Sequence, residues 1–303
     1  MIKRTIEISS PGHDLRVRND QLEIRKRVGN EEQVSQVPCE DIGLLLVDHR
    51  DTTFSHTTMV RLAEYGAAVV FCGENHLPVS LSLPLPSHCE GLWRLESQLQ
   101  ANKPLRKRLW QQLVKEKVIN QAHNLKKGSE THSRLVHLAS RVRSGDPDNI
   151  EAQAARAYWR EWAGEEASFR RDPDGTDALN SMLNYGYSVF RASLGRAIVC
   201  AGLLPAIGLH HANRSNSFCL ADDLLEPMRP WVDARVRSLY RSGVDELDRE
   251  AKAGLLSLLA ETVQMGDSAG PVMVSMHHFV ASLVRCLQGS DKQLQIPVWT
   301  ETN

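Results

Sequence analysis

The chain has 303 residues and carries 36 lysines and arginines against 37 aspartates and glutamates, which gives a formal charge of −1. This balance gives no sign of a polyanionic partner, and the length allows one or two domains with a substantial core. The six cysteines are scattered without a C-x-x-C pair, which argues against a zinc ribbon or a disulfide framework. The first ten residues lack the apolar core of a signal peptide, and no apolar run approaches the ~18 residues of a membrane helix. We therefore expect a cytoplasmic protein without a membrane partner.

Residues 1–86 are predicted to form a small β-rich domain. Asn19-Asp20 is typical of a short hairpin turn, and Gly29-Asn30 offers a second turn. The apolar run Ile42–Val47 has the length of a strand that is buried on both faces. A helix is expected over Ser55–Tyr65, with Gly66 as its end. The first strand holds Ile2, Ile6 and Ile8, the other strands are Leu15–Arg18, Gln21–Arg27, Ala67–Cys72 and Val79–Leu83, and the linker is Leu83–Pro86.

Residues 87–303 are predicted to form an all-helical domain, which makes the fold class α+β. Gly289–Asn303 lacks helical periodicity and is expected to be a C-terminal tail. The tail's Trp299 either folds back on its own chain or contacts a partner subunit, and both alternatives stay open. The predicted helices cover Leu92–Asn102, Pro104–Asn124, His132–Arg143, Ile150–Trp162, Ala178–Ala201, Ala234–Tyr240, Leu247–Thr262 and Val272–Leu287.

One segment breaks the charge balance. Eleven basic and two acidic residues between Lys103 and Arg143 leave a net charge of +9. Such a run is often only a solvated face, but its concentration in a neutral chain is also typical of binding to phosphate backbones. The absence of regularly interleaved aromatic residues favours duplex over single-strand binding. The basic residues are Lys103, Arg106, Lys107, Arg108, Lys115, Lys117, Lys126, Lys127, Arg134, Arg141 and Arg143.

The stretch Leu203–Trp231 brings two histidines, His210 and His211, close before an acidic cluster of Asp222, Asp223 and Glu226. Its polar middle predicts a loop between two helices, with the acidic cluster opening the second. Asp223 and Glu226 have the spacing of a capping box, which is the structural interpretation. Two carboxylates beside a loop histidine are also a candidate site for Mg²⁺ or Mn²⁺. The two interpretations are compatible.

Glu151 lies in the first turn of a predicted helix, with Asp146-Pro147 just upstream as a start signal. On its own, this position indicates only a favourable interaction with the helix dipole. A later helix carries Asn180, Asn184, Tyr185 and Tyr187, which need hydrogen-bond partners if they are buried.

Four segments in this order resemble the CRISPR adaptation integrase family (Cas one). They are Glu151–Trp159, Asn180–Tyr187, Gly208–His211 and Leu220–Pro230. The likeness covers nearly the whole chain, and the sequence of His210–Pro230 is most similar to that of type II members, which accompany Cas nine.

The resemblance implies an N-terminal β-domain (1–86) for dimerisation and partner contacts, and a helical catalytic domain (87–303). It also implies that Glu151, His211 and Glu226 are the catalytic metal ligands for Mg²⁺ or Mn²⁺, with Asp223 as an auxiliary. His211 is preferred over His210, because the family often has an apolar residue at the latter position.

The implied reaction joins the 3′-hydroxyl ends of a short duplex, the prespacer, into the CRISPR repeat array by transesterification, with associated endonuclease activity. The implied partners are double-stranded DNA, a second copy of the chain, the small dimeric protein Cas two and, as a further candidate, Cas nine. Two alternatives remain: a metal-dependent nuclease for branched DNA, and a non-catalytic DNA-binding scaffold whose acidic cluster only caps a helix. The residues expected to hold DNA are Lys103, Arg106, Lys107, Arg108 and Arg229.

Overall fold

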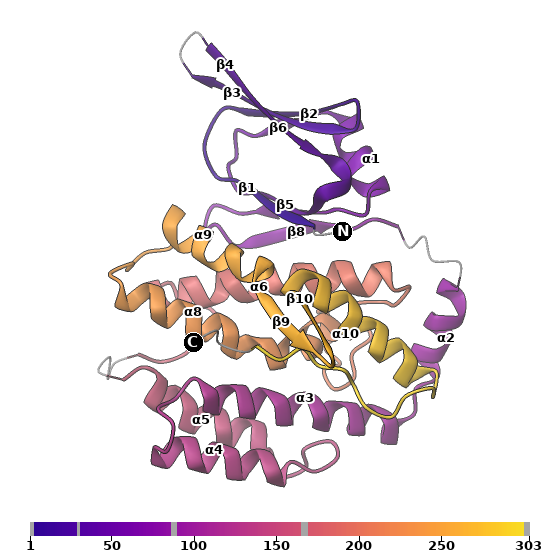
Figure 1. Cartoon of the computed structure of the whole chain (residues 1–303), viewed down its shortest axis with the longest axis vertical. Helices are drawn as coiled ribbons and strands as arrows, with labels where there is room; N and C mark the ends of the chain where they lie inside the picture. Colours follow the sequence, from indigo (N-terminus) through magenta and orange to yellow (C-terminus); the bar gives the residue numbers. More distant parts are fainter. Residues whose placement is uncertain (1–2, 29–30, 86–89, 165–168, 300–303) are drawn as a thin grey trace.

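A β-rich N-terminal region stacks on a larger helical region (Figure 1). The computed structural model describes residues 3–28, 31–85, 90–164 and 169–299. The predicted turn at Gly29-Asn30 lies outside these residues, as does the predicted domain boundary at 86 and 87. The order of a β-rich and then a helical region confirms the predicted fold class.

The first sheet of the N-terminal region is built on the predicted hairpin. Asn19 and Asp20 have φ of 50° and 57°, the left-handed conformation that a type I′ turn requires. They join β2 (His13–Arg18) to β3 (Gln21–Val28) in antiparallel register. β4 (Glu31–Pro38) extends the sheet beside β3, and β6 (Thr53–Phe54) runs parallel to β2.

The second sheet joins the two regions. β1 (Arg4–Ile8), β5 (Ile42–Val47) and β7 (Ala68–Cys72) are parallel, and β8 (Pro78–Ser82) closes the sheet in antiparallel orientation. Leu45 packs in a core with the first sheet and α1 (His56–Glu64), whereas Leu44 and Leu46 belong to the core of the helical region. Because successive side chains of a strand point to opposite faces, the β5 run is buried on both faces, as the sequence predicted.

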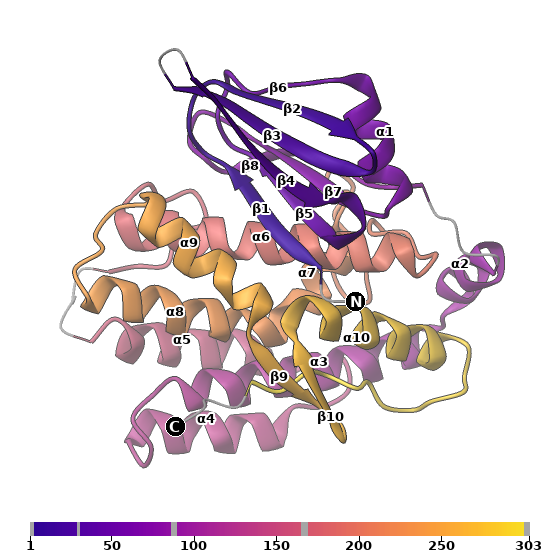
Figure 2. The same ribbon diagram turned by 45° about the horizontal axis from the view of Figure 1, so that its top comes forward.

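The helical region contains the predicted helices and one pair of strands that the sequence did not predict. The pair is β9 (Thr262–Met265) and β10 (Ser268–Pro271), joined by a turn at Gly266 and packed along α10 (Figure 2). The helices are α2 (Gly91–Gln100), α3 (Lys103–His123), α4 (Glu130–Arg141), α5 (Ile150–Trp162), α6 (Ala178–Cys200), α7 (Cys219–Leu225), α8 (Arg229–Arg241), α9 (Arg249–Ser257) and α10 (Val272–Leu287); the short 3₁₀ segments are η1 (Cys39–Asp41), η2 (Glu226–Met228) and η3 (Leu258–Ala260).

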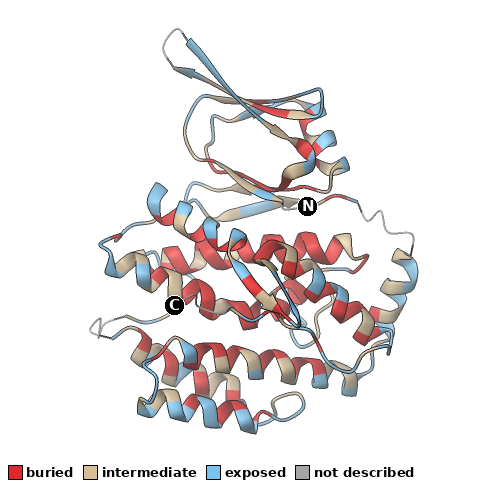
Figure 3. Ribbon diagram, in the orientation of Figure 1, coloured by how far each residue is buried: buried red, intermediate tan, exposed pale blue. Residues whose placement is uncertain are grey.

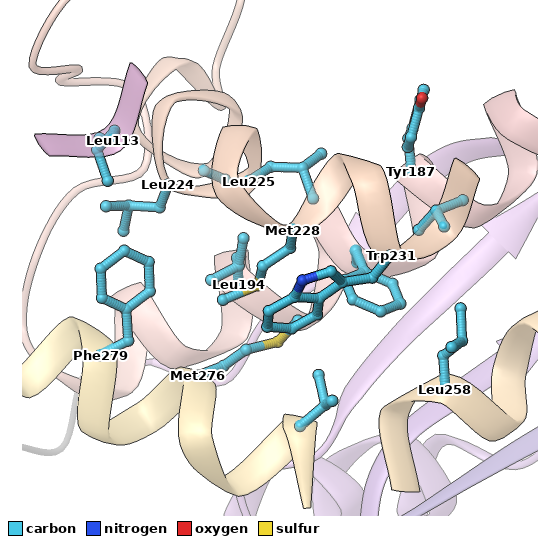
Figure 4. Close-up of a cluster of buried hydrophobic side chains, with 14 of the residues drawn as sticks. Leu113, Tyr187, Leu194, Leu224, Leu225, Met228, Trp231, Leu258, Met276 and Phe279 are labelled. Carbon is cyan, nitrogen blue, oxygen red and sulfur yellow. The ribbon is translucent and has the colours of Figure 1, made fainter. Parts of the chain in front are cut away.

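Helix α6 lies on the side of the helical region that faces the β-rich region (Figure 1), and it is buried along most of its length (Figure 3). A Cβ at Gly186 would lie 2.4 Å from Val232 Cγ1, so only glycine lets α6 and α8 approach this closely. Apolar side chains of α6, α7, α8 and α10 meet in one core, in which Leu194, Leu224, Met228, Trp231 and Phe279 are drawn in Figure 4.

Buried polar contacts fasten the β-rich region to the helices. Lys252 Nζ on α9 lies 2.6 Å from Asp48 Oδ2, just after β5, and both side chains are at most 5% exposed. Tyr185 Oη on α6 donates to Glu7 Oε1 on β1 at 3.0 Å. A buried ion pair is costly to break on one side, so these contacts fix how the two regions sit together.

The tail folds back on its own chain. Val298 pairs with Gln264 of β9 through two backbone hydrogen bonds of 2.8 Å. The Trp299 ring centroid lies 6.3 Å from that of Trp231. Of the two alternatives for Trp299, the structure shows the first, in which the tail packs on its own chain. In the described ranges, no helix is both long and apolar enough to cross a membrane.

Candidate active site

One face of α3 holds the junction between α7 and α8 in place. Lys117, Asn120 and Asn124 are spaced so that they share this face. Pro227 and Pro230 interrupt the helical hydrogen bonding, because proline has no N–H to donate. Asn120 Nδ2 donates to the Pro227 carbonyl at 2.9 Å and Asn124 Nδ2 to the Pro230 carbonyl at 2.6 Å. The two asparagines therefore fix Glu226, which precedes both prolines, against Lys117.

Lys117 lies between two of the three predicted metal ligands. Its Nζ is 2.6 Å from Glu151 Oε1 and 2.5 Å from Glu226 Oε2. Arg229 Nε donates to Glu226 Oε1 at 2.9 Å. Burial works to raise the pKa of Glu226, but Arg229 and Lys117 outweigh it and lower this pKa to about 2. Burial likewise opposes the charge on Lys117, and the two carboxylates raise its pKa above the usual value. Glu226 and Lys117 therefore stabilise each other's charged forms.

Glu151 is not needed to begin its helix. Asp146, with φ of 46°, accepts from the backbone N–H of Ile150 at 2.8 Å and of Glu151 at 3.0 Å. These bonds satisfy the first free N–H groups of α5. The Glu151 carboxylate, 25% exposed, is therefore available to the site.

Asp223 is not the cap that its spacing to Glu226 suggested. Helix α7 begins at Cys219, so Asp223 lies inside it and is fully buried. Its carboxylate instead accepts the backbone N–H groups of Leu209 at 2.6 Å, His210 at 2.9 Å and His211 at 3.3 Å. A Cβ at Gly208 would lie 2.4 Å from the His211 carbonyl oxygen, so this loop needs glycine there. The capping interpretation is wrong, and Asp223 organises the histidine loop.

Asp223 also orients the imidazole of His211. The Nδ1 of His211 lies 2.5 Å from Asp223 Oδ1, which leaves Nε2 as the nitrogen for a further ligand. The hydrogen bond to Asp223 raises the pKa of His211, burial lowers it, and the charges of Glu226 and Glu151 raise it further. His210 stacks on Trp110 with ring centroids 4.3 Å apart and planes within 4°. Asp222, which precedes Asp223 in the chain, accepts from Arg191 Nε at 2.7 Å and thus points away from the site.

Glu151 and Glu226 meet at Lys117 and their charges act on His211, but the three predicted ligands do not form a metal site as they stand. The part of the chain that the structure describes holds no group of three or more acidic, histidine or cysteine side chains that is ready to bind an ion. Glu226 Oε2 is buried, and its partner is the Lys117 ammonium at 2.5 Å. Two carboxylates that already enclose a cation, beside an imidazole, are a donor set that fits Mg²⁺ or Mn²⁺. The assignment of Glu151, His211 and Glu226 as ligands stays a prediction.

A buried acid lies next to this centre. Arg229 stacks its guanidinium over the Tyr187 ring, 4.6 Å from the centroid. Tyr187 Oη and Tyr158 Oη both donate to the carboxylate of Asp233, the latter at 3.0 Å. Burial raises the pKa of Asp233 from 3.8 to about 7, although these hydrogen bonds and Arg229 act to lower it.

We expect the protein to lose stability as the pH rises through this range. The folded chain binds the Asp233 proton more tightly than the unfolded chain, so the stability that the proton contributes is full below about pH 4 and lost by about pH 7. Between about pH 4 and pH 7 the free energy of unfolding should fall by a few kcal/mol, at ~1.4 kcal/mol per pH unit. Asp233→Asn should remove most of this fall. Urea unfolding at several pH values measures it, with the exposed Asp245→Asn as control. The same decline in wild type and Asp233→Asn would contradict the assignment.

The predicted DNA-binding residues have different surroundings. Lys103, Lys107 and Arg108 are exposed near the start of α3. Arg106 is half-buried and donates to the Gln98 carbonyl at 3.2 Å. The Arg229 side chain is 26% exposed and bonded to Glu226. Their role on DNA stays a prediction.

Sequence reasoning missed a second basic surface. A pocket of about 390 Å³ on α5 is lined by four arginines and two aromatic residues, namely Arg156, Arg160, Arg170, Arg171, Trp159 and Phe169. The helix that forms one wall also carries Glu151 in its first turn. The arginines of α5 are four residues apart, and this spacing on one helix face was the available signal.

Comparisons with known proteins identify the family. The family profile described as CRISPR associated protein Cas1 matches residues 6–262. A CRISPR-associated endonuclease Cas1 from Neisseria meningitidis is 37% identical over 273 residues, covering 86% of each chain. A second Cas1 endonuclease, from Pyrobaculum aerophilum, is 28% identical over 300 residues, covering 93% of this chain and 98% of its own. The predicted likeness to type II members is consistent with the Neisseria relative.

Solved structures share the fold. A casposase bound to its integration product superposes with a TM-score of 0.82 at 20% identity, covering 99% of this chain and 95% of its own. A Cas1 protein from Thermotoga maritima gives 0.76 at 18% identity, covering 98% of this chain and all of its own. A β-rich region followed by helices is thus common to these proteins, and the chain belongs to the CRISPR-associated Cas1 family.

Proposed function

We propose that this protein is a metal-dependent DNA integrase that joins the 3′-hydroxyl ends of a prespacer duplex to the CRISPR repeat array, with associated endonuclease activity. One observation carries the proposal. In a member of the Cas1 family, Glu151 and Glu226 converge on a single cation next to His211. The endonuclease relatives and the casposase neighbour support strand cleavage and strand joining as the chemistry.

Each of the site residues has a separate role in the proposed transesterification. Glu151, Glu226 and His211 Nε2 would hold Mg²⁺ or Mn²⁺, which when bound stabilises charge on the attacked phosphate and the leaving oxygen. Asp223 keeps His211 in one tautomer and orientation. Arg229 stabilises Glu226 from the side opposite Lys117 and presents a guanidinium that suits a phosphate. The DNA supplies its own nucleophile, so the chain needs none.

Two of the proposed partners, DNA and Cas2, are supported by solved structures that share the fold. Solved structures that share the fold include a Cas6-RT-Cas1–Cas2 complex and a Cas1–DNA complex. For this chain we propose a homodimer that contacts Cas2 and DNA, with Cas9 as a further partner. The arginine-lined pocket of α5 suits unpaired nucleotides next to the reacting end, because Trp159 and Phe169 add aromatic faces to the four arginines.

Strand joining into a plasmid that contains the repeat tests the function. The protein, its Cas2 partner and a labelled prespacer are incubated with Mn²⁺ or with EDTA. Joined product in Mn²⁺ alone supports the integrase. Cleavage without joining indicates the branched-DNA nuclease, and retarded DNA without any product indicates a non-catalytic scaffold.

Duplex binding should depend steeply on salt despite the neutral chain. Each lysine or arginine on a phosphate releases counterions, with a slope of about −0.9 per contact in a plot of log affinity against log salt. Replacing Lys103, Lys107 and Arg108 by alanine should weaken binding to all duplex sequences alike and reduce the slope by up to about 3. Fluorescence anisotropy at several salt concentrations measures both. An unaltered slope in the triple variant would exclude these residues from the interface.

A further inference from the structure

Lys117 holds an unusual place for a lysine. Its side chain is 10% exposed, and its ammonium lies within 2.6 Å of carboxylate oxygens from α5 and from η2. A lysine is seldom buried unless it is paired. Here it is paired with the two carboxylates that the proposed function assigns to a divalent ion, so the lysine and the ion share one position.

An ammonium and a divalent ion cannot occupy that position together. Metal–oxygen distances of about 2.0–2.2 Å require the ion to lie between the oxygens, where it would meet the positive Nζ at short range. Conversely, without any cation two carboxylates would face each other in a buried site, which is costly. The position between the two carboxylates therefore holds one cation at a time, in addition to Arg229 on Glu226 Oε1.

We infer that Lys117 is a built-in counter-ion that occupies the metal position in the metal-free protein, and that a divalent ion binds by displacing its ammonium. This inference rests on the proposed metal-dependent function. It names a role for a residue that neither binds the metal nor belongs to the predicted ligand set. Lys117 is thus a positioning residue, which keeps Glu151 and Glu226 in place until the ion arrives.

The exchange couples metal binding to DNA binding. In the metal-free cluster the charges of Glu151, Glu226, Lys117 and Arg229 cancel. A divalent ion raises this total to +2, of which +1 remains on the metal, the two glutamates and Arg229, and +1 is the displaced Lys117 ammonium on its flexible four-carbon stem. DNA phosphates can neutralise both. Metal and DNA should then each increase the affinity for the other by the same factor, because coupling between two ligands is reciprocal.

Removing the ammonium is the first test. Lys117→Met should tighten Mn²⁺ binding in the absence of DNA by about tenfold or more, because the ion no longer competes with a cation. In EDTA the same variant should melt at a lower temperature than wild type, and Mn²⁺ should raise its melting temperature by more. The control is Lys115→Met, an exposed position on the same helix, which should behave as wild type. Calorimetric titration and thermal unfolding give these values without an activity assay.

A second test uses the wild-type protein, so it does not depend on whether a variant folds. Acetylation by an N-hydroxysuccinimide ester, read by mass spectrometry, should be slow at Lys117 in EDTA and several-fold faster in saturating Mn²⁺. Lys115 serves as the internal reference in both states.

The outcomes separate the inference from the proposed function. Mn²⁺ binding to wild type with unchanged or weaker affinity in folded Lys117→Met overturns the inference alone, as does acetylation of Lys117 that Mn²⁺ leaves unchanged. Failure of Mn²⁺ to bind any form of the protein, with or without DNA, overturns both.

Discussion

Replacing Glu151 by glutamine is expected to reduce metal-dependent strand joining by about 100-fold to 1,000-fold, with little change in fold or duplex binding. A metal ion supplies several kcal/mol of charge stabilisation, and about 1.4 kcal/mol is a tenfold change in rate. Glutamine keeps the shape of the side chain but removes the negative charge that a hard divalent ion needs. Because Asp146 supplies the hydrogen bonds that begin α5, the helix should form without the Glu151 carboxylate.

Glu161→Gln is the matched control, since it makes the same change on the same helix, where the carboxylate accepts from Ser129 Oγ at 2.8 Å. This variant should join strands at the wild-type rate. Wild-type joining by folded Glu151→Gln in Mn²⁺ would remove this residue from the ligand set. Loss of DNA binding along with activity would instead give Glu151 a structural role.

Asp223→Asn is expected to damage both the fold and the reaction. A helix cap would tolerate the change, because asparagine caps as well as aspartate. The carboxylate of Asp223, however, is surrounded by donors: three backbone N–H groups and His211 Nδ1. An amide has one accepting oxygen, so its NH₂ group must face at least one donor. A buried unsatisfied group costs about 1–3 kcal/mol, and loss of support behind a metal-binding histidine typically costs about 10-fold to 100-fold in affinity or activity.

The neighbouring Asp222→Asn is the control for this change. Asp222 pairs with Arg191 away from the site, and a partly exposed ion pair contributes about 0–1 kcal/mol. Urea unfolding and strand joining measured on both variants separate the two positions. Equal, small losses in the two variants would show that Asp223 does not organise the histidine loop.

Local patterns predicted most of the fold. The hairpin at Asn19-Asp20, the doubly buried β5 and the helices all follow from a few neighbouring residues, whose spacing carries the information. The β9–β10 pair was not predicted, because strands of four residues are too short to show the alternation of apolar and polar residues. Its Gly266-Asp267 turn, between a strand-like TVQM and SAGP, was the signal.

The sequence named the candidate site residues, whose role stays a prediction, but it did not give their contacts. Spacing alone gave Asp223 and Glu226 one shared role, whereas the folded chain separates them. Asp223 meets residues 12 to 14 positions earlier in a loop, and no periodicity reports such a non-local contact. The grouping of Glu151 with His211 and Glu226 came from the family resemblance, because spacing along the sequence does not connect them.

Lys117 shows the limit of counting charges along a sequence. It was one of eleven basic residues in a stretch that suggested a DNA-binding surface, yet its side chain points into the site. Its position does carry a signal. Lys117 follows the buried Leu109 and Leu113 at intervals of four, which places it on the inward stripe of α3.

The ladder of Lys117, Asn120 and Asn124 along α3 has a consequence for how this gene can change in length. One residue inserted between Lys103 and Lys117 would turn the ladder by about 100° and shift it by about 1.5 Å relative to the start of the helix. The asparagines would then miss the carbonyls of Pro227 and Pro230, and Lys117 would miss both glutamates. Insertions and deletions should therefore be rejected between residues 103 and 124.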